Sequence, residues 1–376
     1  MIKVCHMTSA HPSCDIRIFH KECISLAKAG YEVYLVQRGE SCEKTGVHIV
    51  GVGQPSGGRI SRMTTFAKRV YQAALLVDAD IYHIHDPELL GYGLKLKKKG
   101  KKIIFDSHEL YRLQIAAKPY LPKWCAKWIS RCYVYYEDYV LKRIDGVIFP
   151  CTINGKNPFE GKCTYTALID NTPLLQELYN IWKDQKKEKV ACCYVGGIRP
   201  DRGITQDVVA CNRVNIPLIL AGNYSSTEYK ESLYALDHQH CIDWRGCLDR
   251  VGVREVLLES SIGLVTELYC GQNNTTDNLP TKTYEYMSCA LPVIISHSTY
   301  VDRVMKERNF GICVDPNDAD EIASAVRYLL DHPEEARQMG ENGRRAIKEE
   351  FNWGVEEKKL LTFYEKISSE MIEERK

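Results

Sequence analysis

Short apolar runs alternate with amphipathic stretches along this chain, and the alternation occurs twice. Between the first two runs, residues 16–29 place Ile16, Phe19 and Leu26 on one helical face and end before Gly30. Strands that alternate with helices predict parallel, doubly wound sheets with helices on both faces. The strands expected in the first part are Ile2–Met7, Tyr31–Gln37, Ile81–His85, Lys102–Phe105 and Gly146–Phe149, and those expected in the second part are Val190–Val195, Ile216–Ala221, Ser261–Thr266 and Pro292–Ile295.

A polar, charged segment separates the two parts. Residues 171–189 combine Asn and Pro with the charge run KDQKKEK, which is a composition typical of linkers. We therefore expect a Rossmann-like domain over 1–170, a linker over 171–189, a second Rossmann-like domain over 190–352 and a charged helix over 353–376. Ligands of such sheets bind at the carboxyl ends of the strands, so we expect a site in a cleft between the two domains.

Composition excludes several classes of protein. The 50 Lys and Arg balance 49 Asp and Glu, which argues against nucleic-acid binding through bulk electrostatics. The 16 cysteines include no C-x-x-C pair, so we predict reduced thiols in the cytoplasm, not disulfides or a cysteine zinc site. The first residues, MIKVCHMTSAHP, lack the long apolar segment of a signal peptide.

The first candidate site follows the strand expected at 190–195. Gly196 and Gly197 end that strand, and Arg199 and Arg202 come next, before an expected helix. Glycines let backbone N–H groups approach a ligand closely, and guanidinium groups beside a helix N-terminus favour an anion. The segment predicts a diphosphate site, with a simple turn carrying two solvated arginines as the alternative.

The second candidate site lies in residues 277–287. Lys282 and Glu285 are three residues apart on an expected helix that leads into the strand at 292–295. Lys282 would contact a phosphate, and the Glu285 carboxylate would accept hydrogen bonds from the vicinal diol of a ribose. An ordinary ion pair between these two side chains is the alternative.

Polar clusters also follow three strands of the first part. Because the carboxyl ends of neighbouring parallel strands meet at one edge, these clusters are expected to converge on the acceptor side of the site. A capping or core role is the alternative for any one histidine. The candidates are His11, Asp15, Arg17, His85, His108 and Glu109.

Three segments resemble the retaining glycosyltransferases of the family 4 type along essentially the whole chain. They are GGIRPDRG, the segment 277–285 with the following YMSCALPVI, and DPNDADEIASAVRYLLDHPEEARQMGENGRRAI. The resemblance implies the GT-B fold, with two Rossmann-like domains and a last helix that returns to the first domain. It also implies a nucleotide-diphosphate sugar as donor, a glycan or polyprenyl-diphosphate-linked acceptor, and a role in capsular or O-antigen polysaccharide biosynthesis.

The resemblance assigns roles by position. Arg199 and Arg202 would bind the donor diphosphate, although the family usually has Lys at the second position. Glu285 would bind the ribose, and Asp277 replaces the glutamate that contacts the donor sugar. His108 would lie beside that sugar. The remaining donor-side residues are Gly222 and Arg245 near the base and Thr281 near the phosphates, next to Pro280, which replaces a glycine-rich turn.

The expected reaction has an oxocarbenium-like transition state and a departing phosphate. Arg199, Arg202 and Lys282 would stabilise that phosphate without a metal ion or other cofactor. No carboxylate pair is recognisable as nucleophile and acid, which favours front-side attack with retention. Two alternatives stay open: a nucleotide-sugar 2-epimerase, and a catalytically degenerate nucleotide-sugar-binding protein, suggested by Asp277 and Pro280.

Two basic segments favour contact with an anionic membrane. Residues 95–102 are a dense basic run, and residues 120–143 interleave aromatic with cationic side chains. Such a helix suits the surface of an anionic bilayer, so we expect a cytoplasmic protein that is peripheral at the plasma membrane. A half-buried helix with a solvated cationic face is the alternative.

Overall fold

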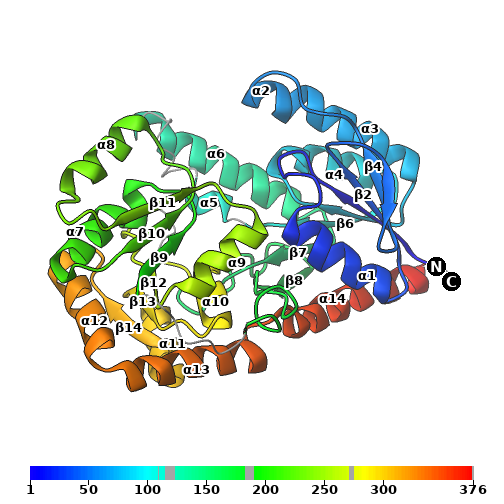
Figure 1. Ribbon diagram of the computed structural model, residues 1–376. Helices are drawn as coiled ribbons and strands as arrows, with labels where there is room; N and C mark the ends of the chain where they lie inside the picture. The colour runs from blue at the N-terminus through cyan, green and yellow to red at the C-terminus, as the bar shows by residue number, and fades with distance from the viewer. Residues whose placement is uncertain (109, 115–122, 183–189, 271–274, 375–376) are drawn as a thin grey trace. The chain divides into compact units, whose positions relative to one another are not determined.

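A computed structural model describes residues 1–108, 110–114, 123–182, 190–270 and 275–374. The chain forms two compact units (Figure 1). The first contains residues 1–152, 156–171 and 354–376, and the second contains residues 153–155 and 172–353. The main boundary thus falls at the start of the expected linker, whose charge run, 183–189, lies outside the described residues. Among the described helices, none is both long and apolar enough to cross a bilayer.

The first unit is built on an eight-stranded sheet. Its strand order is β3-β4-β2-β1-β5-β6-β7-β8, and all pairs are parallel except β3 with β4. The five strands expected from the sequence are present, and three strands at or next to the edges, β3, β4 and β8, were not expected. The strands are β1 (Lys3–Met7), β2 (Glu32–Gln37), β3 (Cys42–Lys44), β4 (Val47–Gly51), β5 (Ile81–Ile84), β6 (Lys102–Asp106), β7 (Gly146–Phe149) and β8 (Tyr165–Leu168).

Helices cover this sheet. The expected helix at 16–29 begins as a π-helix capped by Asp15 and continues as α1. The last helix of the chain packs on β7, where a Cβ added at Gly146 would meet Phe363 at 2.5 Å. The helices are η1 (Ile16–Cys23), α1 (Ile24–Lys28), α2 (Arg59–Ser61), η2 (Arg62–Phe66), α3 (Ala67–Val77), η3 (Pro87–Leu89), α4 (Leu90–Lys97), α5 (Tyr111–Gln114), α6 (Lys123–Leu141) and α14 (Trp353–Glu374).

The second unit has a six-stranded parallel sheet of order β11-β10-β9-β12-β13-β14. The chain winds outward in one direction from β9 and then in the other from β12, so the switch point lies between these two strands. Hydrophobic cores cover both faces. The strands are β9 (Cys192–Val195), β10 (Leu218–Ala221), β11 (Ile242–Gly246), β12 (Ile262–Val265), β13 (Val293–Ser296) and β14 (Gly311–Val314).

The helices of the second unit follow these strands in turn (Figure 1). Gly203, the residue just before the helix at Ile204–Val214, has a φ of +75°. It lies so close to the end of β12 that an added Cβ would be 1.9 Å from the carbonyl oxygen of Thr266. The helices are η5 (Pro200–Arg202), α7 (Ile204–Val214), α8 (Thr227–Leu236), α9 (Arg250–Glu259), α10 (Thr281–Ser288), α11 (Thr299–Arg308), α12 (Ala319–Asp331) and α13 (Pro333–Glu349). The close approach at Gly203 brings the loop after β9 against the end of β12.

Candidate functional site

A cavity of about 390 Å³ opens at the switch point of the second unit. Its lining comes from the loop after β9, the end of β12 and the start of α10, which the sheet order makes neighbours. The polar residues that line it are Tyr194, Arg199, Arg202, Glu267, Thr276, Asn278, Thr281, Lys282 and Ser298, together with Gly196, Gly197, Pro280 and Val301.

Two of the three expected cations meet at one buried carboxylate. Lys282 Nζ lies 2.5 Å from Glu267 Oε1, and Arg202 Nη1 pairs with the same oxygen. Only 5% of the Glu267 side chain is exposed. Arg199 lines the cavity as expected, but its side chain is 46% exposed and makes a bidentate pair with Asp201.

The group formed by Glu267, Lys282 and Arg202 keeps a net positive charge. Burial alone would raise the pKa of Glu267, but the charges of Lys282 and Arg202 bring it below its usual value. Burial also lowers the pKa of Lys282, and the negative charge of Glu267 partly offsets this shift. With Glu267 ionised, two cations face one anion, and a phosphate would compete with Glu267 for the same donors.

Sequence reasoning missed Glu267. It follows β12 directly, after Thr266, at the carboxyl end of a strand next to the switch point. The rule that polar residues after such strands face the site would have found it, had the neighbours of β12 been known.

The glycine pair contributes less than expected. The N–H of Gly196 donates to the carbonyl oxygen of Ala221 at 2.9 Å, so this amide is not available to a ligand. Gly197 keeps open space, because a Cβ there would meet nothing within 4 Å. The Tyr194 hydroxyl donates to the Gly197 carbonyl oxygen and fixes the loop.

Lys282 and Glu285 lie on α10 but have different partners. Pro280 precedes the helix, so Thr281 and Lys282 occupy its first turn. Glu285 lies 2.7 Å from Nη1 of Arg250, and Lys282 lies beside Glu267. The expected closeness of Lys282 and Glu285 is thus replaced by two separate ion pairs.

The residues expected near the base and the donor sugar make local contacts. The Trp244 indole N–H donates to the carbonyl oxygen of Gly222 at 2.9 Å. Arg245 pairs with Asp243 at 2.6 Å and with Glu259 at 3.3 Å. Asp277 accepts a hydrogen bond from the N–H of Gly155 at 2.5 Å.

In the first unit, the strand ends bring His11 and His108 together. Their Nε2 atoms are 3.0 Å apart, and His11 Nδ1 lies 3.2 Å from Asp86 Oδ1. Burial would lower the pKa of His11, but Asp86 raises it above its usual value. Burial lowers the pKa of His108, whose Nδ1 faces the carbonyl oxygen of Asp106. Of the two imidazoles, His11 is therefore the one that takes up a proton more readily.

Three other expected acceptor-side residues have internal partners instead. Arg17 is buried and makes a bidentate pair with Asp106, with both hydrogen bonds at 2.9 Å. His85 is fully buried beside the same carboxylate. Asp15 caps η1 by accepting from the N–H groups of Arg17 and Ile18. These contacts favour positioning roles over direct acceptor binding. Glu109 lies outside the described residues.

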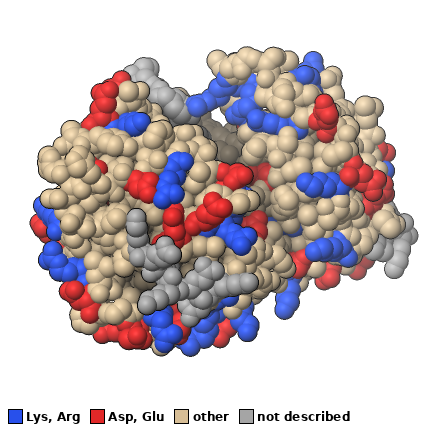
Figure 2. All heavy atoms as spheres, in the orientation of Figure 1, with Lys and Arg blue, Asp and Glu red and all other residues tan. Residues whose placement is uncertain are grey.

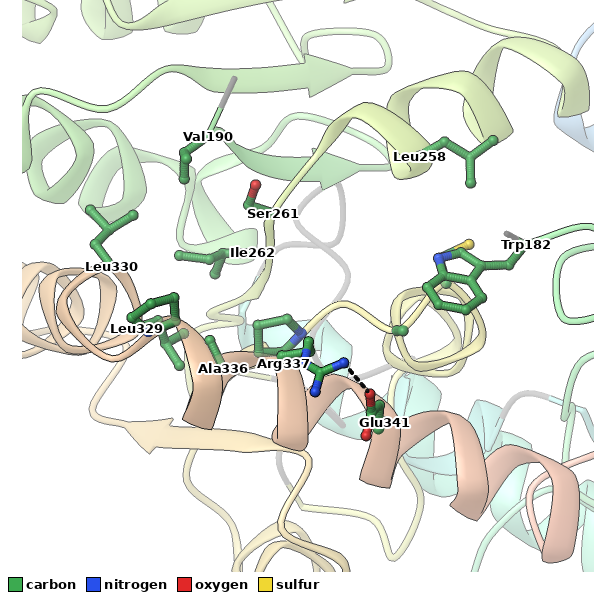
Figure 3. Close-up of a pocket in the computed structure, with 14 residues that line it drawn as sticks. Trp182, Val190, Leu258, Ser261, Ile262, Leu329, Leu330, Ala336, Arg337 and Glu341 are labelled. Atoms are coloured by element: carbon green, nitrogen blue, oxygen red, sulfur yellow. Dashed lines mark ion pairs between the residues drawn. The ribbon is translucent and has the colours of Figure 1, made fainter. Parts of the chain in front are cut away.

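A second cavity of the same unit, about 260 Å³, lies at the opposite end of the sheet (Figure 3). Val190 and Ser261 precede β9 and β12, so this cavity lies at the amino ends of the strands. Its lining is mostly apolar, apart from the pair between Arg337 and Glu341. Because ligands of doubly wound sheets bind at carboxyl ends, the cavity at Lys282 is the better candidate.

Asp207 in the wall behind the site predicts a pH dependence of stability. Burial raises its pKa to about 7, and the Thr266 hydroxyl donates to Oδ1 at 2.7 Å. Between pH about 4 and 7 the unfolded chain releases this proton and the folded chain keeps it, so the free energy of unfolding falls by up to about 4 kcal/mol.

The Asp207→Asn variant cannot ionise at this position. We expect its free energy of unfolding to exceed that of the wild type by an amount that grows from pH about 4 to 7 and then stays constant. Urea unfolding of both proteins across this range measures it. A difference that does not change with pH would exclude the assigned pKa.

Each of the two units matches a model of a known protein family. Residues 179–346 match the family model of Glycosyl transferases group 1, and residues 18–153 match that of Glycosyltransferase Family 4. An uncharacterised glycosyltransferase of Methanocaldococcus jannaschii is 24% identical over 305 residues, which cover 76% of this chain and 72% of that protein.

Solved structures share the fold. Sucrose-phosphate synthase from Thermosynechococcus elongatus aligns with a TM-score of 0.76 at 17% identity, covering 98% of this chain and 100% of that chain. Anabaena HepE in complex with UDP-glucose aligns with a TM-score of 0.69 at 12% identity, covering 98% of this chain and 100% of that chain. These likenesses confirm the expected fold class of two Rossmann-like domains.

Proposed function

The chain is a glycosyltransferase of the family 4 type with the GT-B fold, and we propose that it transfers a sugar from a nucleotide diphosphate with retention of configuration. The acceptor we propose is a glycan or a polyprenyl-diphosphate-linked glycan, in capsular or O-antigen polysaccharide biosynthesis. The observation that supports the donor class is the convergence of Arg202 and Lys282 on one buried position at the switch point.

The proposed reaction begins with breakage of the bond between the anomeric carbon and the phosphate oxygen. That oxygen keeps the electron pair, and Arg202 and Lys282 stabilise the growing negative charge. The acceptor hydroxyl attacks the same face of the sugar, and its proton passes to the departing phosphate. Arg199, at the cavity edge, adds positive charge once the diphosphate draws it from Asp201. These side chains supply the positive charge that the step requires.

Glu285 and the His11–His108 pair have positioning or contact roles in this proposal. Glu285 accepts hydrogen bonds from the ribose diol in place of its pair with Arg250. The two imidazoles present one shared proton at the carboxyl edge of the first sheet. His108 contacts the donor sugar, and His11 orients His108.

Product analysis with a panel of nucleotide sugars tests the proposal. UDP-glucose is the first donor to try, because the solved Anabaena protein holds it. We expect release of the nucleoside diphosphate and a new glycosidic bond when a glycan acceptor is added. Epimerised sugar formed without an acceptor would support the 2-epimerase instead. Nucleotide-sugar binding with no turnover, even as slow hydrolysis, would support the degenerate binding protein.

The two basic segments expected at a membrane differ in how exposed their side chains are. In the run at 95–102, Lys97 pairs with Asp145 at 2.6 Å, and Lys102 is buried and pairs with Glu370 at 2.9 Å. Part of this run is therefore occupied by internal ion pairs, and it is not the free basic patch that the sequence suggested. Over most of the face in Figure 2, acidic and basic side chains are interspersed.

Helix α6 retains the expected amphipathic character. Its exposed stripe carries Trp128, Arg131, Tyr135 and Tyr139 at helical spacing, and exposed Lys142 follows the last residue of the helix. The Trp128 side chain is 67% exposed. On the opposite face of α6, Glu137 is buried and pairs with Arg112 of α5. An exposed stripe of aromatic and cationic residues supports our proposal that α6 contacts an anionic bilayer surface.

Vesicle flotation measures this contact. The wild type is expected to float with anionic vesicles at low ionic strength, and the Trp128→Ala/Tyr139→Ala variant is expected to bind about tenfold more weakly. Tyr234→Ala removes an exposed aromatic ring from α8 of the other unit and serves as the control. If the wild type stays with the unbound fraction at low salt, the membrane proposal is wrong.

A further inference from the structure

Four titratable side chains cluster inside the first unit, and the proposed reaction uses none of them to contact substrate. They are His6 of β1, Glu22 of η1, His83 of β5 and His85 just after β5, and all four are fully buried. One nitrogen from each imidazole and one oxygen from the carboxylate lie within 4.8 Å of one another.

Three imidazole nitrogens lie at similar distances from one carboxylate oxygen of Glu22. Its Oε2 atom lies 3.9 Å from His6 Nδ1, 3.7 Å from His83 Nδ1 and 3.8 Å from His85 Nε2. These separations are too long for hydrogen bonds, so neither a protonated Glu22 nor a protonated imidazole bridges them. Among the described residues, Glu22 Oε2 has no hydrogen-bond partner, whereas His6 Nδ1 and His85 Nε2 lie 2.9 Å apart and His83 Nδ1 bonds the Tyr364 hydroxyl at 2.8 Å.

A cation at the centre of the four atoms would account for this arrangement. Zinc binds imidazole nitrogen and carboxylate oxygen at about 2.0–2.2 Å with tetrahedral geometry, which places its ligand atoms roughly 3.3 Å from one another. The three separations at Glu22 are slightly longer, and the contact of 2.9 Å between His6 Nδ1 and His85 Nε2 is slightly shorter. Small side-chain shifts would therefore close a four-ligand shell.

We propose that His6, Glu22, His83 and His85 bind one divalent transition-metal ion, with zinc the best match, as a structural site of the first unit. Neutral imidazoles and a carboxylate are the ligands that zinc prefers. Four protein ligands leave no open position for a substrate, so the role is to join β1, β5 and η1 beneath the carboxyl edge of the sheet.

The surroundings have the features of an outer ligand shell. His85 Nδ1 lies 3.2 Å from Asp106 Oδ2, the carboxylate–histidine arrangement that orients metal ligands. Arg17 joins that carboxylate to Glu22 through contacts of 2.9 and 3.1 Å. A shift of His83 toward the ion through Nδ1 would replace its hydrogen bond to the Tyr364 hydroxyl.

Elemental analysis of the untagged full-length protein tests the proposal without any assay of activity. We expect about one zinc ion per chain after zinc-supplemented refolding, and loss of that ion in His83→Gln. Cobalt in place of zinc should give the visible absorption of a tetrahedral site. His48→Gln, an exposed histidine on β4, is the control and should keep the metal.

The Glu22→Gln variant separates the proposal from a metal-free network. If a metal is bound, this change should remove it and lower the melting temperature by several degrees. If none is bound, adding zinc or a chelator should leave the melting temperatures of the wild type and of Glu22→Gln unchanged. Refolded wild type that binds no zinc or cobalt would overturn the proposal, as would metal content that His83→Gln leaves unchanged.

Discussion

Replacing Lys282 with alanine is expected to slow sugar transfer by about 10²–10³-fold, which is the cost of losing one stabilising contact to a developing oxyanion. Lys282 is half-buried and shares the buried carboxylate of Glu267 with Arg202. The diphosphate gains one further negative charge as the sugar leaves, so the loss should appear in kcat. Steady-state kinetics with saturating donor measures it.

Two companion variants separate catalysis from folding. Lys282→Ala leaves Glu267 with one cation in a buried place, so part of its effect could be structural. Lys282→Met removes the charge, keeps most of the packing and leaves Glu267 in a balanced pair with Arg202, so it should keep stability without regaining turnover. Lys306→Ala, on the exposed side of α11, should behave as the wild type. Near-normal kcat in Lys282→Ala would remove Lys282 from the mechanism.

The change Glu285→Ala is expected to lower kcat/KM for the donor by about 10–100-fold, because a hydrogen bond to a charged group contributes about 1.5–3 kcal/mol. Glu285 is mostly buried on α10 and paired with Arg250. The effect should reside mainly in KM, since the ribose keeps the same contacts in the ground state and the transition state.

A donor that lacks one ribose hydroxyl provides the matching test. The wild type should discriminate strongly against the deoxy donor, and Glu285→Ala should discriminate little. Arg250→Ala frees Glu285 from its ion pair, so we expect it to bind the donor at least as well as the wild type does. Equal discrimination by the wild type and Glu285→Ala would place the ribose elsewhere.

The sequence predicts the two Rossmann-like units because buried parallel strands are continuous apolar runs, and every such run forms a strand. Five strands escaped prediction because each lies at or next to a sheet edge, where one or both faces are exposed and the pattern weakens: β3, β4 and β8 in the first unit, and β11 and β14 in the second. The π-helical start of η1 has no signature in the sequence either.

The site is predicted only where spacing along the chain fixes it. The loop after β9 and the start of α10 each carry their cations in one short segment, and the cavity lining includes both. Glu267 was missed because its role depends on the neighbour of β12 in the sheet. Arg17 and His85 were placed at the acceptor because a polar residue after a strand gives no sign of being buried.

A structure of the protein with a bound nucleoside diphosphate tests the central claim most directly. The account predicts that diphosphate oxygens lie within hydrogen-bond distance of both Arg202 and Lys282, with Glu267 displaced from at least one of them. A diphosphate bound elsewhere, with those two side chains still closed on Glu267, would contradict it.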